Sequence, residues 1–174
     1  MKKHPILIAL IAIICCSFKI AAPTADTHIS WMTWEQAQAA QKKKPKKIFV
    51  DVYTDWCGWC KRMDATTFEN PAIAKYMSEH FYCVKFNAET KETITFKGEA
   101  YKTDGRYSSL ATFLLQNKMS FPTTLYLDET LNLLTTVPGY MAPKDAEPVL
   151  NYFGTNSFKT TSWEEYQKSF KGTL

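Results

Sequence analysis

The chain has 174 residues, of which 45% are apolar and 14% aromatic, so it can bury a core as one globular domain and is too apolar for a disordered chain. Its formal charge of +4 is unevenly placed, because residues 1–25 hold three lysines and no acidic residue. Beyond residue 25 the chain has 18 of its 21 basic residues and all 17 acidic residues, which gives a net charge of +1. That balance excludes the strongly basic face of a nucleic-acid-binding domain, and we expect no nucleic-acid partner.

The N-terminal segment has the pattern of an export signal. A positively charged start precedes an apolar run at residues 6–16, which is too short to span a bilayer but has the length of a signal-peptide core. We therefore expect residues 1–25 to be a signal peptide or an N-terminal anchor, and residues 26–174 to form a domain in the periplasm or cell envelope. Cys15 and Cys16 leave a lipid anchor open as an alternative.

The rest of the chain alternates helical and strand patterns. A capping box at Thr33 and Gln36 begins a helix that ends before Pro45, and Asn70-Pro71 begins another. In chain order we expect a helix over 33–43, a strand over 48–53, a helix from residue 61, a helix over 71–80, strands over 81–87 and 93–96, a helix over 107–116, an antiparallel hairpin of strands over 125–128 and 131–137, a helix over 143–153 and a short helix from residue 162. This order predicts an α/β fold with a central mixed β-sheet flanked by helices on both faces.

Three cysteines remain beyond residue 25, namely Cys57, Cys60 and Cys83. Small scaffolds stapled by disulfides carry an even set of four or more, so the close pair is the candidate for function. We interpret Cys83, in an expected strand, as a small buried hydrophobic residue, and a third redox thiol is the alternative.

The segment Cys57-Gly58-Trp59-Cys60 stands where a strand gives way to a helix. Unpaired amides and the helix dipole at such a position lower thiol pKa values to about 3.5–7.5, which would make an exposed Cys57 an attacking thiolate. Two intervening residues place Cys60 one turn later, within reach of the first sulfur. A mixed disulfide formed by Cys57 could therefore be resolved by Cys60.

Three other interpretations of the pair stay open. A zinc site needs four ligands, and beyond residue 25 the sequence offers only Cys83, His28 and His80 to complete the pair. A copper relay would use the pair with a histidine or Met63. A static structural disulfide would need no further residue.

Residues 49–61 resemble the active-site strand and motif of the thioredoxin superfamily, and are most similar to its exported bacterial branch that works with membrane thiol–disulfide interchange systems. Residues 84–87 resemble the third strand of that family, residues 121–124 its cis-proline loop, and Gly139 the glycine that ends its last strand. The resemblance covers about residues 45–153 and implies a thioredoxin-like fold.

The resemblance also implies that Cys57 attacks, Cys60 resolves, and Asp51 accepts the proton of Cys60. An isolated acid in a buried strand has a raised pKa, which suits a proton acceptor near neutrality; a solvated Asp51 is the alternative. Lys85 matches a lysine that modulates this acid in the family, although a simple surface lysine fits the sequence equally well. Trp56 matches a residue that shields the disulfide, and its alternative role is core packing.

Pro122 matches a cis proline that faces the disulfide, with a trans proline at a strand start as the alternative. Phe121 would then offer its backbone to an extended substrate segment, with Trp59 and Gly139 as further substrate-binding residues. Two features depart from the family pattern: the motif holds Gly58-Trp59 where reducing thioredoxins commonly have Gly-Pro, and Phe121 is bulky. Both leave the direction of electron flow open.

A longer connection than usual, at about residues 88–118, is a further departure, and we expect it to form a flap that faces the substrate. Together these features predict a monomeric thiol–disulfide oxidoreductase of the cell envelope that reduces or isomerises disulfides in exported proteins without a cofactor or metal. The resemblance implies a membrane electron donor. The alternatives are a copper or cytochrome assembly factor that uses the same pair, and a non-catalytic thioredoxin-like binding module.

Overall fold

A computed structural model describes residues 28–173 of the chain. The expected signal peptide or anchor over residues 1–25, with Cys15 and Cys16, lies outside these described residues. Within residues 28–173 no helix is both long enough and apolar enough to cross a membrane.

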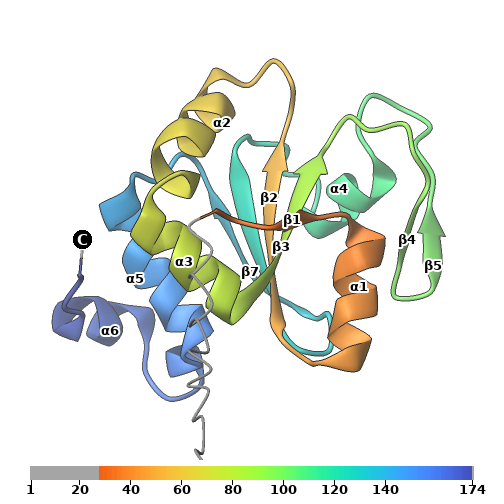
Figure 1. The fold of residues 1–174 in the computed structure, drawn as a ribbon. Coiled ribbons are helices and arrows are strands. Elements are labelled where there is room, and N and C mark those ends of the chain that lie inside the picture. Colours follow the sequence, from red (N-terminus) through yellow and green to blue (C-terminus); the bar gives the residue numbers. More distant parts are fainter. Residues whose placement is uncertain (1–27, 174) are drawn as a thin grey trace, which may run out of the picture.

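The described residues form an α/β domain around one five-stranded sheet, with a small two-stranded sheet beside it (Figure 1). The elements in chain order are β1 (Trp31–Met32), α1 (Trp34–Lys43), β2 (Lys47–Tyr53), α2 (Gly58–Met63), the π-helix η1 (Asp64–Phe68), α3 (Pro71–His80), β3 (Phe81–Asn87), β4 (Ile94–Phe96), β5 (Glu99–Tyr101), α4 (Ser109–Leu114), β6 (Thr123–Leu127), β7 (Leu133–Pro138), α5 (Pro143–Gly154), the 3₁₀-helix η2 (Ser157–Lys159) and α6 (Trp163–Ser169). The predicted mixed sheet with helices on both faces is confirmed.

The central strand of the sheet is β2, which leads directly into the cysteine motif. The strand order is β1-β3-β2-β6-β7. β2 pairs in parallel with β3 and antiparallel with β6, and β6 and β7 form the predicted antiparallel hairpin. Because β2 is covered on both faces, its sequence is almost continuously apolar, and its single acid, Asp51, is held inside the domain.

Alternation along β2 decides which face each side chain reaches. Ile48, Val50 and Val52 belong to the apolar cluster under α1 and α4, whereas Phe49 belongs to the cluster under α3 and α5 (Figure 1). Successive strand residues point to opposite faces, so Asp51 shares the face of Phe49. This face is also the one that α2 covers, since Met63 of α2 packs in the same cluster as Phe49. The acid and the cysteine helix are therefore placed on one side of the sheet.

The predicted helix starts are confirmed by their capping contacts. Thr33 and Gln36 form a reciprocal capping box at α1, and Ser162 and Glu165 form another at α6. At α3 the Asn70 side chain accepts hydrogen bonds from the first amides of the helix, and a proline follows it.

Several elements differ from the sequence-based expectation, since β1, β5 and η2 were not expected and one helix is shorter. β1 was not expected, because two residues carry no periodicity; Trp31 and Met32 add a parallel edge to β3. The helix expected over 107–116 is shorter, since α4 ends at Leu114 and both Gln116 and Asn117 have positive φ.

The β4–β5 hairpin, in the middle of the connection over residues 88–118, packs on α1, so this part of the connection does not form the expected substrate-facing flap. Ile94 and Phe96 of β4 are buried in the cluster that contains Trp34 of α1. Gln38 of α1 donates to the Thr95 carbonyl at 2.7 Å. The apolar side of the β4–β5 hairpin thus packs on α1, on the right of Figure 1, whereas α2 lies on the left.

Candidate active site

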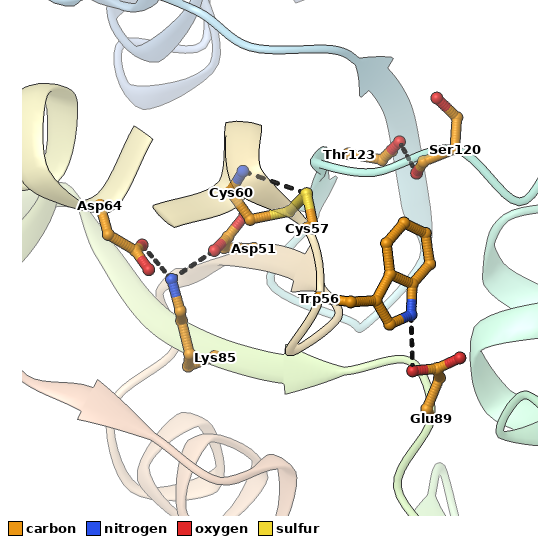
Figure 2. The surroundings of a disulfide bond; sticks show 9 residues. All are labelled: Asp51, Trp56, Cys57, Cys60, Asp64, Lys85, Glu89, Ser120 and Thr123. Atoms are coloured by element: carbon orange, nitrogen blue, oxygen red, sulfur yellow. Dashed lines mark hydrogen bonds and ion pairs between the residues drawn. A yellow bond between two sulfur atoms is a disulfide. The ribbon is translucent and has the colours of Figure 1, made fainter. Parts of the chain in front are cut away.

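The cysteine pair lies at the start of α2, at the end of the strand β2. Cys57 is the N-cap residue, and its sulfur accepts a hydrogen bond of 3.1 Å from the Cys60 amide. The two side chains form a disulfide, with their Cα atoms 5.3 Å apart (Figure 2). The helix continues without a break into η1, so the pair stands at the head of an eleven-residue helical segment that runs from 58 to 68.

Cys57 was expected to be exposed, and this expectation is wrong for the oxidised pair. The residue is only 4% exposed, because its sulfur is bonded to Cys60 and turned toward the first amides of the helix. Its two tryptophan neighbours are open to solvent, with Trp56 57% and Trp59 59% exposed.

Asp51 is buried below the pair, as the sequence predicts, and only 1% of it is exposed. Burial raises the pKa of Asp51 to about 6, even though Lys85 nearby acts in the opposite direction. Its Oδ2 accepts a hydrogen bond of 2.6 Å from Lys85 Nζ, and its Oδ1 has no hydrogen-bond partner among the described residues. In Figure 2 the carboxyl lies between Lys85 and Cys60. It is placed to hold or release a proton beside Cys60.

Lys85 is partly buried and paired, so the alternative of a simple surface lysine is wrong. Its Cα is the register partner of the Asp51 Cα on the neighbouring strand. The ammonium group also forms an ion pair with Asp64, and it lies 5.0 Å from the ring centre of Trp31. Burial by itself lowers the pKa of Lys85, but the two carboxylates raise it, so the ammonium stays charged.

Asp64 is a site residue that the sequence analysis missed. It is the first residue of η1, seven positions after Cys57, and it shares the Lys85 ammonium with Asp51. The only sequence signal was an acid one turn beyond Cys60, and such residues are usually solvated. Its role depends on the fold, which brings β3 beneath the helix.

Trp56 packs at the surface and not in the core, so the core-packing alternative is wrong. Its indole N–H donates to Glu89 at 2.9 Å (Figure 2). Its ring meets the ring of Phe121 edge-on, with centroids 6.0 Å apart. It stands beside Cys57 on the side of β6. The predicted shielding of one side of the disulfide is consistent with this position, and it stays a prediction.

The Phe121–Pro122 peptide bond is cis, as predicted. Gly139, with φ +98°, follows β7, and its amide donates to the Pro122 carbonyl at 2.8 Å. A groove of about 280 Å³ opens here, lined by Trp59, Phe121, Pro122, Gly139 and Tyr140. The three residues expected to bind substrate thus meet at one groove with the cis proline, and Tyr140 is added by the structure.

Cys83 is buried in the core, and burial raises its pKa to about 12. Met63 is also buried in the core, and His80 stacks on Tyr76. Among residues 28–173 there is no group of three or more His, Cys, Asp and Glu side chains placed to hold a metal ion. The copper interpretation therefore has no donor set in this part of the chain beyond the cysteine pair itself.

The fold and the site define a thioredoxin-like domain that carries a CxxC cysteine pair. A family model described as a thioredoxin-like domain matches residues 34–154, and the chain belongs to this family. The matched segment begins with α1 and ends with α5, and it includes both the motif and the cis-proline loop.

Comparison with known proteins finds distant relatives. An uncharacterized protein of Caenorhabditis elegans is 27% identical over 149 residues, which is 84% of this chain and 19% of that protein. The thiol:disulfide interchange protein DsbD of Escherichia coli (strain K12) is 27% identical over 94 residues, 54% of this chain and 14% of that one. The chain thus spans less than a fifth of the length of these curated relatives. A thioredoxin from Thermus thermophilus superposes with a TM-score of 0.57 at 14% identity, covering 83% of this chain and 98% of that structure, which shows the shared fold.

Proposed function

We propose that this chain is a thiol–disulfide oxidoreductase that reduces or isomerises disulfides in other proteins through Cys57 and Cys60. The observation that carries the proposal is the position of the disulfide: it starts a helix, lies over the buried acid Asp51, and stands beside a groove that contains a cis proline. A static structural disulfide would need neither the buried acid nor the groove.

The first step begins from the reduced pair. The Cys57 thiolate, favoured by the amides at the helix start, attacks one sulfur of the substrate disulfide. A mixed disulfide forms between Cys57 and the substrate, and the second substrate sulfur leaves as a thiolate that takes a proton. An extended substrate segment would lie in the groove beside Phe121 and Pro122, where backbone contacts tolerate varied sequences.

The second step needs a thiolate at Cys60. The Cys60 thiol gives its proton to the Asp51 carboxylate, and the resulting thiolate attacks the Cys57 sulfur. This forms the Cys57–Cys60 disulfide and releases the first substrate sulfur as a thiolate, which takes a proton from water. Two electrons pass from the pair to the substrate, so a separate dithiol donor has to reduce the pair before the next cycle. A buried acid whose pKa is raised to about 6 is suited to exchange this proton near neutral pH.

The proposed location is the cell envelope, with exported disulfide-containing proteins as substrates and a membrane protein as electron donor. Two observations support it: the charged and apolar N-terminal pattern of the sequence, and the similarity to a relative whose name is thiol:disulfide interchange protein. An oxidising compartment would require such a donor to keep the pair reduced.

The test is reduction of insulin disulfides by dithiothreitol, with and without the protein. The wild type should accelerate the reaction, and Cys57→Ser should abolish the acceleration. Reduced Cys60→Ser, mixed with insulin after dithiothreitol has been removed, should instead accumulate a mixed disulfide at Cys57, seen as an added mass that fresh reducing agent removes. The proposal fails if the wild type gives no acceleration, or if Cys57→Ser retains it. Tight Cu(I) binding without acceleration would favour the metal assembly alternative.

A further inference from the structure

The side chain of Trp56 is an unusual feature of the surface, because a large apolar ring is 57% exposed and yet is held by three partners. One partner, Phe121, belongs to the cis-proline loop. The other two, Glu89 and Arg106, belong to the connection between β3 and α4. Their positions in the chain are far apart, and the fold brings them together beside the disulfide.

Glu89 and Arg106 act on the indole as a pair. Glu89 accepts a hydrogen bond of 2.9 Å from the Trp56 indole N–H with one carboxylate oxygen (Figure 2). Its other carboxylate oxygen accepts from Arg106 Nε at 2.8 Å. The Arg106 guanidinium lies 5.6 Å from the centre of the indole ring, within the range of a cation–π contact. The indole edge and the indole face are therefore both held by this pair.

The same loop also reaches the second aromatic side chain of the site. Tyr107, next to Arg106 in the chain, lies against Phe121 with ring centroids 5.7 Å apart, and Phe121 in turn lies against Trp56. Arg106 also stacks on Tyr107 at 5.2 Å. Trp56 and Phe121, which stand beside the disulfide and its groove, are thus supported from behind by one loop.

The Glu89–Arg106 ion pair contributes little to the free energy of folding. Its role is therefore to position Trp56 and not to stabilise the fold. The Arg106 side chain is 64% exposed, and ion pairs at such exposure add little to stability because water and salt screen them. An exposed indole without these contacts would sample several rotamers, and a substrate would have to order it on binding. Holding the ring in advance removes that cost from the binding step.

We propose that Glu89 and Arg106 are positioning residues that hold Trp56 in the orientation in which it contacts a protein substrate, so that the connection over residues 88–118 sets substrate affinity. This rests on the proposed function, since it assigns a role in the binding step of that reaction. The chemical step is left to the cysteines and Asp51. Substitutions of Glu89 and Arg106 should therefore raise KM and leave kcat nearly unchanged.

The experiment compares Glu89→Ala, Glu89→Gln and Arg106→Ala in insulin reduction. Glu89→Ala and Arg106→Ala should each raise KM about threefold to fivefold with kcat unchanged, in proportion to the strength of exposed ion pairs. The double variant should raise KM by less than the product of the two single effects, because the Glu89–Arg106 ion pair couples the two contacts with the indole. Glu89→Gln keeps an acceptor for the indole and should recover part of the affinity. The matched control is Lys102→Ala, which removes a cation from the same loop and should change nothing.

A second readout follows Trp56 directly, through its indole N–H signal in a ¹H–¹⁵N spectrum assigned with Trp56→Phe. In Glu89→Ala the signal should move and its proton should exchange faster with water, whereas Lys102→Ala should leave it in place. The inference is overturned if the wild type reduces insulin and both KM and the indole signal are unchanged in Glu89→Ala. An inactive wild type would count against the proposed function alone, and the indole signal would still decide whether the pair holds Trp56.

Discussion

Lys85 Nζ lies 2.6 Å from Asp51 Oδ2, and the two residues face each other as register partners on adjacent strands below the disulfide. The ion pair offsets the cost of burying the Asp51 carboxylate only in part, because the pKa of that group is still raised to about 6. Asp64 contributes to the raised pKa of Asp51, since it shares the Lys85 ammonium and adds its own negative charge. The site therefore keeps a carboxyl group that can gain or lose a proton near neutral pH.

Replacing Asp51 by asparagine should stabilise the oxidised protein at neutral pH. A native pKa raised from 3.8 to about 6 means that the native state holds this proton more tightly than the unfolded chain does. The stability from the protonated carboxyl is present at pH 3.8 and below, and is lost as the pH rises through about 6. The asparagine side chain does not titrate, so at pH 7 the Asp51→Asn variant should be more stable by about 1–3 kcal/mol.

Urea unfolding of the oxidised protein at pH 4 and at pH 7 measures this difference. The gain should be small at pH 4 and largest at pH 7. Asp55→Asn serves as the control, because Asp55 is an exposed acid beside the same motif and should show no such gain. An equal effect of Asp51→Asn at both pH values would contradict the assignment of a buried carboxyl with a raised pKa.

Replacing Lys85 by methionine should shift the pH dependence of disulfide reduction. The Lys85 ammonium lowers the pKa of Asp51 against the effect of burial, so its removal should raise that pKa further. Asp51 would then stay protonated to higher pH and accept the Cys60 proton less readily. The acid side of the pH–rate profile should move to higher pH by about one unit. A profile that moves to lower pH, or does not move, would count against the coupling of the two residues.

Much of the fold could be predicted from local patterns. The apolar run of β2, the capping boxes at Thr33 and Ser162, and the Asn70-Pro71 start each depend on neighbouring residues alone, and each is confirmed. The pairing of β1 depends on a distant partner strand, and its two residues gave no signal. Residues after Leu114 fit a helical pattern, but their backbone turns to positive φ.

The site could be predicted where a residue has a fixed spacing from the motif. Asp51 and Cys60 stand at such spacings, and the structure brings them to one place. Asp64, Glu89 and Arg106 could not be found in this way, because surface acids and arginines are common and usually solvated. Their roles appear only when the fold places Lys85 and Trp56 beside them.

Cys83 should be unreactive in the native protein. Its sulfur is buried between β3 and α3, and burial raises its pKa to about 12, so almost no thiolate forms at pH 8. Reduced native protein treated with an excess of a thiol-specific disulfide reagent should release as many equivalents quickly as its Cys83→Ser variant does, and one more only after unfolding in guanidinium chloride. Fast release of one equivalent more than the Cys83→Ser variant gives, from folded protein, would favour the alternative of a third redox thiol.

Gly139 should be needed for its backbone conformation. Its φ of +98° lies where only glycine is unstrained, although no atom lies close enough to meet an added Cβ. Gly139→Ala should therefore lower the free energy of unfolding by about 1–2 kcal/mol through backbone strain alone. Gly58→Ala is the matched comparison, because Gly58 also has open space around it but lies in a helix, and alanine there should be neutral or stabilising. Equal effects of the two substitutions on urea unfolding would exclude strain at Gly139.

The central claim, that Cys57 and Cys60 form a working redox couple, is tested most directly by the equilibrium reduction of the pair in dithiothreitol and glutathione buffers. Trp56 and Trp59 beside the disulfide offer the fluorescence signal, and Cys57→Ser provides the baseline without the couple. The account predicts one reversible two-electron transition with a potential between those of a reducing thioredoxin, about −270 mV, and a disulfide isomerase, about −180 mV. A pair that does not titrate reversibly, and so stays oxidised or is reduced without re-forming, would contradict the account.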